Sequence, residues 1–178
     1  MNIFKDYLKP VITLLVICII VGAVLAAVNS VTAPRIEANE LEAANATYYA
    51  ALPEADTFTE MECDISGVTH VLKADNGSGY VITAASRGYN GDVPAAAAFS
   101  GEGTILRVIM MENSETPGMG QKVTESSFED QFTGLKAEEI TLEDIDAVSG
   151  ATISSRAAVN AINLAIQAFN QVKEGGSR

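Results

Sequence analysis

A run of hydroxyl and carboxyl side chains at residues 146–155 precedes the last apolar segment of the chain. The run reads Asp-Ala-Val-Ser-Gly-Ala-Thr-Ile-Ser-Ser, with Thr152, Ser154 and Ser155 near its end. Such residues favour the start of a helix, where a side-chain oxygen caps the free backbone N–H groups. The same N–H groups and the helix dipole attract phosphate. The run therefore predicts either a capped helix or an anion site.

Two further segments contain residues that could do chemistry. Residues 114–120 read Ser-Glu-Thr-Pro-Gly-Met-Gly. Pro followed by Gly is typical of a type II turn, which accounts for those two residues and not for the Glu-Thr pair before them. Residues 88–93 read Gly-Tyr-Asn-Gly-Asp-Val, the pattern of a hairpin turn that carries an aromatic side chain.

Together the three segments, within residues 80–172, resemble the FMN-binding domain family. Their order and their places at strand and helix boundaries agree with that family. There a flavin transferase joins FMN to the last threonine of Ser-Gly-Ala-Thr by a phosphoester bond, which implies Thr152 as the acceptor. The threonine hydroxyl attacks the pyrophosphate of FAD and expels AMP. The transferase must supply the base, because none is visible in this chain.

The resemblance implies a set of cofactor-binding residues and a role for some of them. The helix dipole and the hydroxyls of Ser154 and Ser155 would stabilise the phosphate. Met119 would pack on the flavin ring. The whole set is Thr152 (the covalent FMN phosphoester), Glu115, Thr116, Gly118, Met119, Ser149, Gly150, Ala151, Ser154, Ser155 and Tyr89. No catalytic residue and no metal site is predicted.

Composition argues against several other classes of protein. The chain has 178 residues, with 11 Lys and Arg against 23 Asp and Glu, and a net charge of −12. Nucleic acid is therefore an unsuitable partner, because phosphate backbones are bound by clustered basic residues. An apolar content of 48% is too high for a disordered chain. Two cysteines and one histidine do not form a Cys-rich zinc site or a disulfide framework.

An apolar run at residues 11–28 contains Thr13 as its only conventionally polar residue, and Pro10 precedes it at a position where helices start. A helix of that length spans about 27 Å, close to the ~30 Å hydrocarbon core of a bilayer. The run is longer than the ~7–15 residues of a signal-peptide core. This favours a retained transmembrane helix at 11–29 over a cleaved signal peptide.

The flanking charges predict the orientation of that helix. Residues 1–10 contain two lysines, and a single arginine follows the apolar run closely. The positive-inside rule then predicts a cytoplasmic N-terminus in the cell membrane and an extracytoplasmic remainder. That remainder is expected to divide into a stalk or docking helix with a linker at 30–59, opened by Pro34, and a domain at 60–178.

Residues 60–111 show the alternation and the turn signals of short strands. Strands are predicted at 68–74, 79–85, 94–99 and 104–111, with turns at 75–77 and 100–103. Tight turns favour an antiparallel sheet over βαβ units. Apolar residues recur at helical spacing from 154 to 172, which predicts a helix packed on the sheet. Residues 126–145 are expected as loops and a short helix. The fold class is α+β, with an antiparallel-sheet FMN-binding domain and packed helices behind a transmembrane helix.

Within the FMN-binding domain family, a short anchor followed by one such domain resembles the G subunit of the Rnf complex. That complex exchanges electrons between ferredoxin and NAD and moves ions across the membrane. The resemblance implies an electron-relay subunit with covalent FMN and no stand-alone catalysis. Its partners would be the other membrane and iron-sulfur subunits of the complex, and a flavin transferase for maturation.

Three other interpretations stay open. The C subunit of the Na⁺-translocating NADH–quinone reductase shares the anchor and the motif, although it is usually longer. A membrane-anchored scaffold without a cofactor would use the acidic segment 37–64 to bind partners. A stand-alone extracytoplasmic reductase would act on a soluble acceptor without partner subunits.

Overall fold

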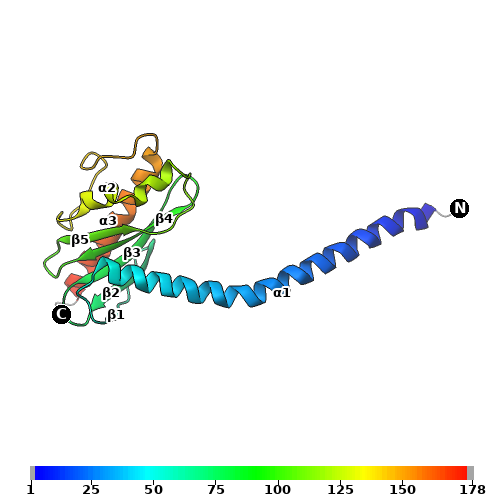
Figure 1. Ribbon diagram of the computed structural model, residues 1–178, viewed down its shortest axis with the longest axis horizontal. Helices are drawn as coiled ribbons and strands as arrows, with labels where there is room; N and C mark the ends of the chain where they lie inside the picture. The colour runs from blue at the N-terminus through cyan, green and yellow to red at the C-terminus, as the bar shows by residue number, and fades with distance from the viewer. Residues whose placement is uncertain (1–2, 176–178) are drawn as a thin grey trace. The chain divides into compact units, whose positions relative to one another are not determined.

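Two units make up the structure, with the boundary between residues 44 and 45. The computed structural model describes residues 3–175, without the side chains of residues 3–8, 34 and 37–41. The first unit is helical, and the second contains the sheet and the remaining helices (Figure 1).

Helix α1 (Ile3–Ala51) begins the described chain. Its segment Lys9–Ala33 covers 25 residues, has a mean hydropathy of 3.2 and is not buried. Among the described residues, this is the one helix whose length and composition suit a membrane span. Thr13 and Thr32 each donate a hydroxyl hydrogen bond to the carbonyl oxygen four residues earlier, at 2.9 Å. These bonds lower the cost of placing hydroxyl groups in an apolar environment.

Both early prolines lie inside α1. The sequence predicts that Pro10 and Pro34 each open a helix, and the structure contradicts this because the helix is continuous through both. A proline removes one backbone hydrogen bond, a loss that a long helix tolerates where the residues on either side keep the helical conformation. The helix ends at Ala51, just before Pro53, as the sequence predicts.

Five strands form one antiparallel sheet in sequence order. They are β1 (Phe58–Glu60), β2 (Val68–Ala74), β3 (Tyr80–Arg87), β4 (Asp92–Phe99) and β5 (Ile105–Met110). The β2–β3 turn closes where the Gly77 N–H donates to the Ala74 carbonyl at 3.0 Å. Gly77 has a φ of +76° there, which glycine adopts without steric cost. The predicted antiparallel sheet is confirmed. The short edge strand β1 is not among the strands that the sequence predicts.

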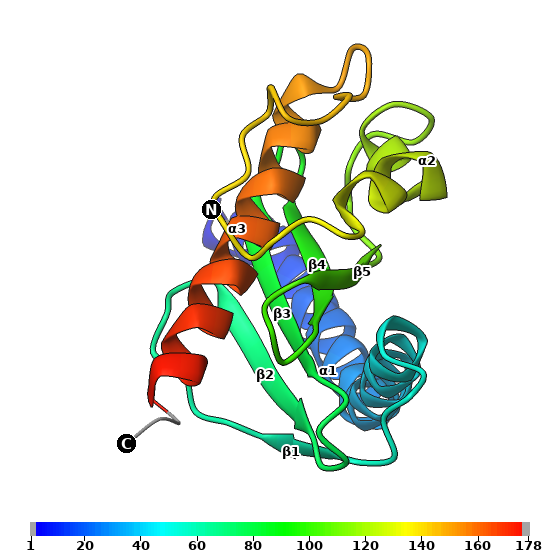
Figure 2. The same ribbon diagram turned by 90° about the vertical axis from the view of Figure 1, so that its left-hand side faces the viewer.

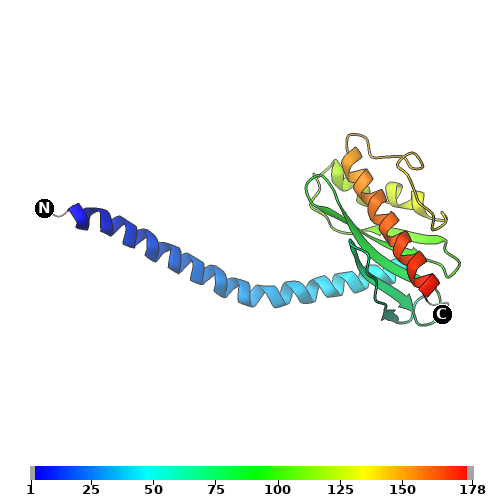
Figure 3. The same ribbon diagram turned by 180° about the vertical axis from the view of Figure 1, so that it is seen from behind.

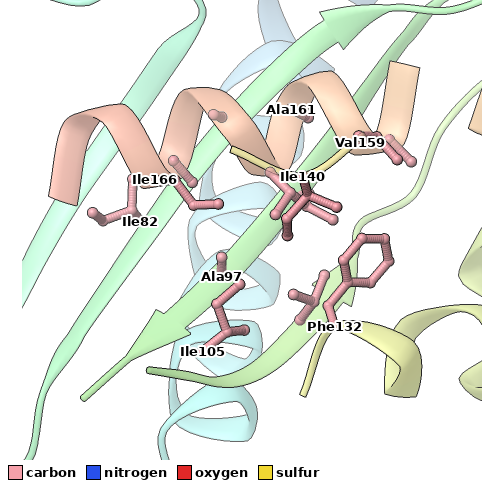
Figure 4. Close-up of a cluster of buried hydrophobic side chains, with 14 of the residues drawn as sticks. Ile82, Ala97, Ile105, Phe132, Ile140, Val159, Ala161 and Ile166 are labelled. Atoms are coloured by element: carbon pink, nitrogen blue, oxygen red, sulfur yellow. The ribbon is translucent and has the colours of Figure 1, made fainter. Parts of the chain in front are cut away.

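Helix α3 (Thr152–Gly175) lies across one face of this sheet, as Figures 2 and 3 show from two sides. It packs chiefly on β3 and β4. Residues 95–98 of β4 are all alanine and fully buried. Ala95 and Ala97 belong to the core beneath α3, and their small side chains let the helix approach closely, whereas Ala96 and Ala98 face the other side of the sheet. The apolar cluster in Figure 4 combines Ile82, Ala97 and Ile105 from the sheet, Val159, Ala161 and Ile166 from α3, and Phe132 and Ile140 from the segment between them.

The end of α1 covers the opposite face of the sheet. Val71 belongs to the core beneath α3, so the side chain of its neighbour His70 points to the other face. There the ring of Tyr48 lies 6.2 Å from the His70 ring and 6.5 Å from the Phe58 ring. The central strands β3 and β4 are therefore buried on both faces, beneath α3 on one and at Val81, Ala96 and Ala98 on the other. Towards β2 this second face is more open, and the His70 side chain is 48% exposed.

Short helices connect β5 to α3. They are the 3-10 helix η1 (Gly120–Thr124), α2 (Ser126–Glu129) and the 3-10 helix η2 (Asp130–Phe132). The rings of Phe128 and Phe132 are buried and meet edge-on at 5.5 Å. The Glu129 carboxylate accepts the N–H of Met110 at 2.7 Å, which satisfies a donor on the edge strand β5. This agrees with the predicted loops and short helix.

Phe169 joins α3 to the sheet, and its removal should destabilise the domain strongly. Its ring stacks on Phe99 at 4.9 Å and meets Tyr80 edge-on at 5.5 Å. Phe169→Ala should lower the free energy of unfolding by about 3–5 kcal/mol, measured by urea denaturation. Gln167→Ala changes an exposed residue of the same helix and should stay within ~0.5 kcal/mol of the wild type. Equal losses in the two variants would contradict this packing account.

Candidate functional site

Three segments meet around a cavity of about 450 Å³. They are the β3–β4 turn at 88–91, the loop at 113–120 after β5, and residues 149–154 at the start of α3. The lining residues are Tyr89, Thr116, Met119, Gly120, Gly150, Ala151, Thr152, Ile153 and Ser154. Small-molecule sites have volumes of about 300–1,000 Å³. The three segments that the sequence singled out therefore form one site of ligand size.

The first turn of α3 reaches this cavity without a capping side chain. The Ser155 N–H donates to the Ala151 carbonyl at 2.9 Å, which makes Ala151 the N-cap residue. Alanine has no side-chain acceptor. Within residues 3–175, no acceptor binds the backbone N–H groups of Thr152, Ile153 or Ser154. Free N–H groups and the helix dipole attract an anion. Of the two alternatives that the sequence predicts, a capped helix and an anion site, the uncapped first turn favours the anion site.

The two serine hydroxyls of this turn bind protein groups. Ser155 Oγ is fully buried, accepts the Val148 N–H at 3.0 Å and does not line the cavity. Ser154 Oγ donates to the Glu115 carboxylate. Neither hydroxyl donates toward the cavity in this structure, which differs from the phosphate-stabilising role that the sequence predicts for them. The donors that remain for an anion are the backbone N–H groups of residues 152–154 and the hydroxyls of Thr116 and Thr152.

Thr152 lies at the rim of the cavity with its side chain exposed. Within the described chain, its hydroxyl has no hydrogen-bonding partner and no base beside it. The first turn of α3 contains no acidic residue, and the exposed Arg156 follows one helical turn later. The hydroxyl is therefore accessible to a second protein and stands in a locally positive setting.

Large apolar side chains at the cavity rim face solvent. Tyr89 is 69% exposed, Ile153 53% and Met119 49%. In the described part of the second unit, the other exposed large apolar residues are Tyr49 and Leu106, so most of this exposure gathers at the cavity. Exposed apolar groups beside convergent polar donors are typical of a binding site.

A buried carboxylate, that of Glu115, lies behind the cavity wall and is 1% exposed. One of its oxygens accepts the backbone N–H groups of Asn90 at 2.8 Å and Gly91 at 3.3 Å, and the other accepts the Ser154 hydroxyl. Burial raises the pKa of this carboxyl. The hydrogen bonds from Ser154 and from the backbone of Asn90, Gly91 and Tyr89 outweigh burial, so the pKa lies below its ordinary value.

Acid should weaken the domain through Glu115. A free glutamate has a pKa of 4.5 and the folded group titrates lower. The stability that ionised Glu115 gives to the folded domain is complete at pH values above the pKa of free glutamate. It is lost as the pH falls through the pKa of the folded group. Urea midpoints measured from about pH 7 to about pH 3 should fall more for the wild type than for Glu115→Gln. Asp75 and Asp144, which also have lowered pKa values, are present in both proteins. Parallel curves for the two proteins would contradict this assignment.

Most of the predicted cofactor-binding residues come together at the cavity. These are Tyr89, Thr116, Met119, Gly150, Ala151, Thr152 and Ser154. Glu115 and Ser155 lie behind it, whereas Gly118 and Ser149 are exposed on the loops and do not line it. Glu115 is among the predicted cofactor-binding residues, and in this structure protein donors hold both of its carboxylate oxygens.

Sequence reasoning left out two lining residues, Gly120 and Ile153. Both lie inside the segments that it selected, and Ile153 directly follows Thr152. A Cβ added at Gly120 would lie 2.7 Å from Ser154 Oγ and 2.9 Å from Glu115 Cβ. Close packing therefore requires glycine at this position. The place of Gly120 at the end of the 114–120 segment was the one feature of the sequence that could have identified it as a site residue.

A family model and two solved structures match this domain. The family model described as FMN-binding domain matches residues 88–167, which contain the three cavity segments. The structure of the C subunit of Na(+)-translocating NADH-quinone reductase from Parabacteroides distasonis has a TM-score of 0.50 and 20% identity, covering 60% of this chain and 61% of that one. Shewanella oneidensis NqrC has a TM-score of 0.50 and 23% identity, covering 67% and 70%. Residues 88–167 thus match the FMN-binding domain model, in a domain that has the fold of these reductase subunits and follows an N-terminal apolar helix.

Matches along the whole chain identify the particular family. The model described as RnfG N-terminal region matches residues 1–50. The G subunit of the ion-translocating oxidoreductase complex of Methanosarcina acetivorans is 32% identical, over 96% of this chain and 98% of that protein. The G subunit of the Na(+)-translocating ferredoxin:NAD(+) oxidoreductase complex of Acetobacterium woodii is 27% identical, over 96% and 95%. This chain belongs to the RnfG family, the G subunits of the ion-translocating Rnf oxidoreductase complexes.

Proposed function

We propose that this chain is the electron-relay subunit of a membrane-bound, ion-translocating ferredoxin:NAD oxidoreductase complex. We further propose that it carries FMN bound covalently through a phosphoester to Thr152. The observation that carries the proposal is the open first turn of α3, where free N–H groups and the exposed Thr152 hydroxyl share one cavity.

The residues around the cavity fit FMN. The backbone N–H groups of Thr152, Ile153 and Ser154 would hold the phosphate. A phosphate esterified to the flavin and to Thr152 keeps one negative charge, which the helix dipole and the nearby Arg156 would favour. The apolar rim side chains would contact the ring system. The cavity volume of about 450 Å³ lies within the range of cofactor sites.

Attachment would be a group transfer from FAD to Thr152. The threonine oxygen forms a bond to the FMN-side phosphorus, the bond from that phosphorus to the AMP oxygen breaks, and AMP leaves. The hydroxyl proton passes to a base of the flavin transferase, because the described residues place no base beside Thr152. The exposure of Thr152 supports modification by a second protein.

A covalent link suits a cofactor held on an exposed, acidic domain. The chain has a net charge of −12, so a loosely bound anion would be held poorly. The bound FMN supplies the electron transfer. The residues of the chain would hold its phosphate, contact its ring and fix its position relative to partner subunits.

The names of the relatives support the proposed assembly and its place. The proteins from Clostridium ljungdahlii and Acetobacterium woodii are named as subunits of ferredoxin:NAD(+) oxidoreductase complexes. By this relationship we expect the other membrane and iron-sulfur subunits as partners. The lysines before the apolar segment favour a cytoplasmic N-terminus, with the FMN domain outside the cytoplasm.

A second candidate is the C subunit of a Na⁺-translocating NADH–quinone reductase, which the shared fold favours. The extent of sequence similarity supports the Rnf role instead. The Methanosarcina acetivorans relative is 32% identical over 96% of this chain, whereas the two solved reductase chains are 20% and 23% identical and cover 60% and 67% of it.

Co-expression of the full chain with a flavin transferase tests the proposal. On a denaturing gel under ultraviolet light, we expect a fluorescent band at the mass of the chain, and none when the transferase is omitted. A chain that stays dark with an active transferase would reject the covalent relay and favour the scaffold interpretation. Reduction of a soluble acceptor by the purified chain alone would favour a stand-alone reductase.

A further inference from the structure

We propose that Glu115 is a positioning residue that holds the β3–β4 turn and the start of α3 in register, so that Tyr89, Thr152 and the free N–H groups of α3 face one ligand. The identity of that ligand as FMN rests on the proposed function. Glu115 does not line the cavity. It would act through the Ser154 side chain and through the backbone at 89–91.

The hydrogen bonds of Glu115 connect all three cavity segments. From the loop after β5, its carboxylate accepts the N–H groups of Asn90 and Gly91 on the β3–β4 turn and the hydroxyl of Ser154 on α3. The contacting groups are all donors, so a carboxylate, which only accepts, satisfies each of them. Bonds to a charged acceptor are stronger than neutral ones, and here they join segments far apart in sequence.

The backbone of Glu115 is itself held in place. Its N–H donates to the side-chain carbonyl of Asn113 at 3.1 Å. One residue before it, the Ser114 carbonyl accepts the side-chain amide of Asn90 at 2.6 Å. The loop after β5 and the β3–β4 turn are thus joined by side-chain bonds in both directions, which limits where the carboxylate can lie.

Two glycines leave the space that Glu115 occupies. A Cβ at Gly88 would lie 2.6 Å from Glu115 Oε1, and a Cβ at Gly120 would lie 3.0 Å from Oε2. Neither glycine has a positive φ, so backbone conformation does not require glycine at these positions. A Cβ at Gly88 would also lie 2.8 Å from Val93 Cγ2, and one at Gly120 would lie 2.7 Å from Ser154 Oγ. The close packing around Glu115 therefore leaves no room for a side chain at either position.

The position of Glu115 also explains how α3 keeps an open start. The first turn of α3 contains no acidic residue, although a negative charge there stabilises a helix. Glu115 supplies that charge from another segment and contacts the helix through the Ser154 side chain. A capping side chain on α3 itself would occupy the backbone N–H groups of its first turn. Because the charge comes from Glu115 instead, the N–H groups of residues 152–154 stay free for a ligand.

Hydrogen exchange on the full chain, produced without a flavin transferase, tests the positioning directly. Glu115→Asp keeps the charge but is one methylene shorter, so we expect the Asn90 and Gly91 amides to exchange at least ~10-fold faster. Glu115→Gln keeps the length, and its amide can donate to Ser154, so these amides should stay within ~3-fold of the wild type. Glu112→Gln, at an exposed position of the same loop, is the matched control and should change neither.

Core amides of β3 and β4 should exchange at the wild-type rate in all these variants, which separates positioning from general unfolding. Unchanged protection of Asn90 and Gly91 in Glu115→Asp would overturn the proposal. So would a loss in Glu115→Gln as large as or larger than that in Glu115→Asp, because the length of the side chain would then not be the decisive property.

Attachment of flavin to the purified variants by a transferase supplies the second measurement. The attachment rate should fall at least ~10-fold in Glu115→Asp and recover to within ~3-fold in Glu115→Gln. The visible circular dichroism of the attached flavin should change in Glu115→Asp alone. A wild-type rate and spectrum in Glu115→Asp would overturn the proposal. An unlabelled wild type would instead reject the proposed function, and hydrogen exchange would still decide the role of Glu115.

Discussion

The Thr152→Ala chain, co-expressed with a flavin transferase, is expected to show no fluorescent band on a denaturing gel. A phosphoester to residue 152 needs a side-chain oxygen, and alanine has none. Thr152 is exposed and its hydroxyl has no partner within the described chain. The free energy of unfolding should therefore stay within ~0.5 kcal/mol of the wild type, measured by urea denaturation.

Two variants make this result specific. Thr116→Ala removes another exposed threonine of the same cavity and should keep the fluorescent band. Thr152→Ser retains a hydroxyl at the acceptor position and should also keep it. Fluorescence in Thr152→Ala, or its loss in Thr116→Ala with Thr152 intact, would contradict Thr152 as the acceptor.

Ala151→Asp should make the domain more stable and, at the same time, a poor acceptor of flavin. Ala151 is the N-cap residue of α3, and an Asp there can accept the free N–H groups that follow. Such a cap is worth about 0.5–2 kcal/mol relative to alanine. The same side chain would occupy the donors meant for phosphate and place a negative charge in the cavity that Ala151 lines. Attachment should fall at least ~10-fold.

Ala151→Ser separates the two causes, because serine caps the helix without adding a charge. It should raise the urea midpoint and reduce attachment less than Ala151→Asp does. Attachment is measured as flavin fluorescence per amount of protein, and stability as the urea midpoint. Full labelling of Ala151→Asp would mean that the start of α3 does not hold the phosphate.

Local sequence patterns were sufficient to predict the sheet and the last helix. Alternating apolar residues in 68–74 and the Asp75-Asn76-Gly77 turn define the β2–β3 hairpin within the segment itself. The apolar spacing that defines α3 likewise needs no distant residue. The three motifs each predicted a turn or a helix start, and their family resemblance predicted that they would meet at one site.

Features that depend on distant contacts were not predicted. The edge strand β1 is three residues long and pairs only with β2, too short to show a period. The continuation of α1 through Pro34 contradicts the local rule for proline. The orientation of Glu115 away from the cavity depends on donors at residues 90, 91 and 154. No spacing within residues 114–120 encodes those partners.

Mass spectrometry of the chain isolated from its native membrane tests the central claim most directly. Trypsin cleaves after Lys136 and Arg156, so the acceptor lies in the peptide that spans residues 137–156. The account predicts that this peptide carries the mass of one FMN less one water, and that fragment ions place it on Thr152. An unmodified peptide, or a flavin on another residue, would contradict the account.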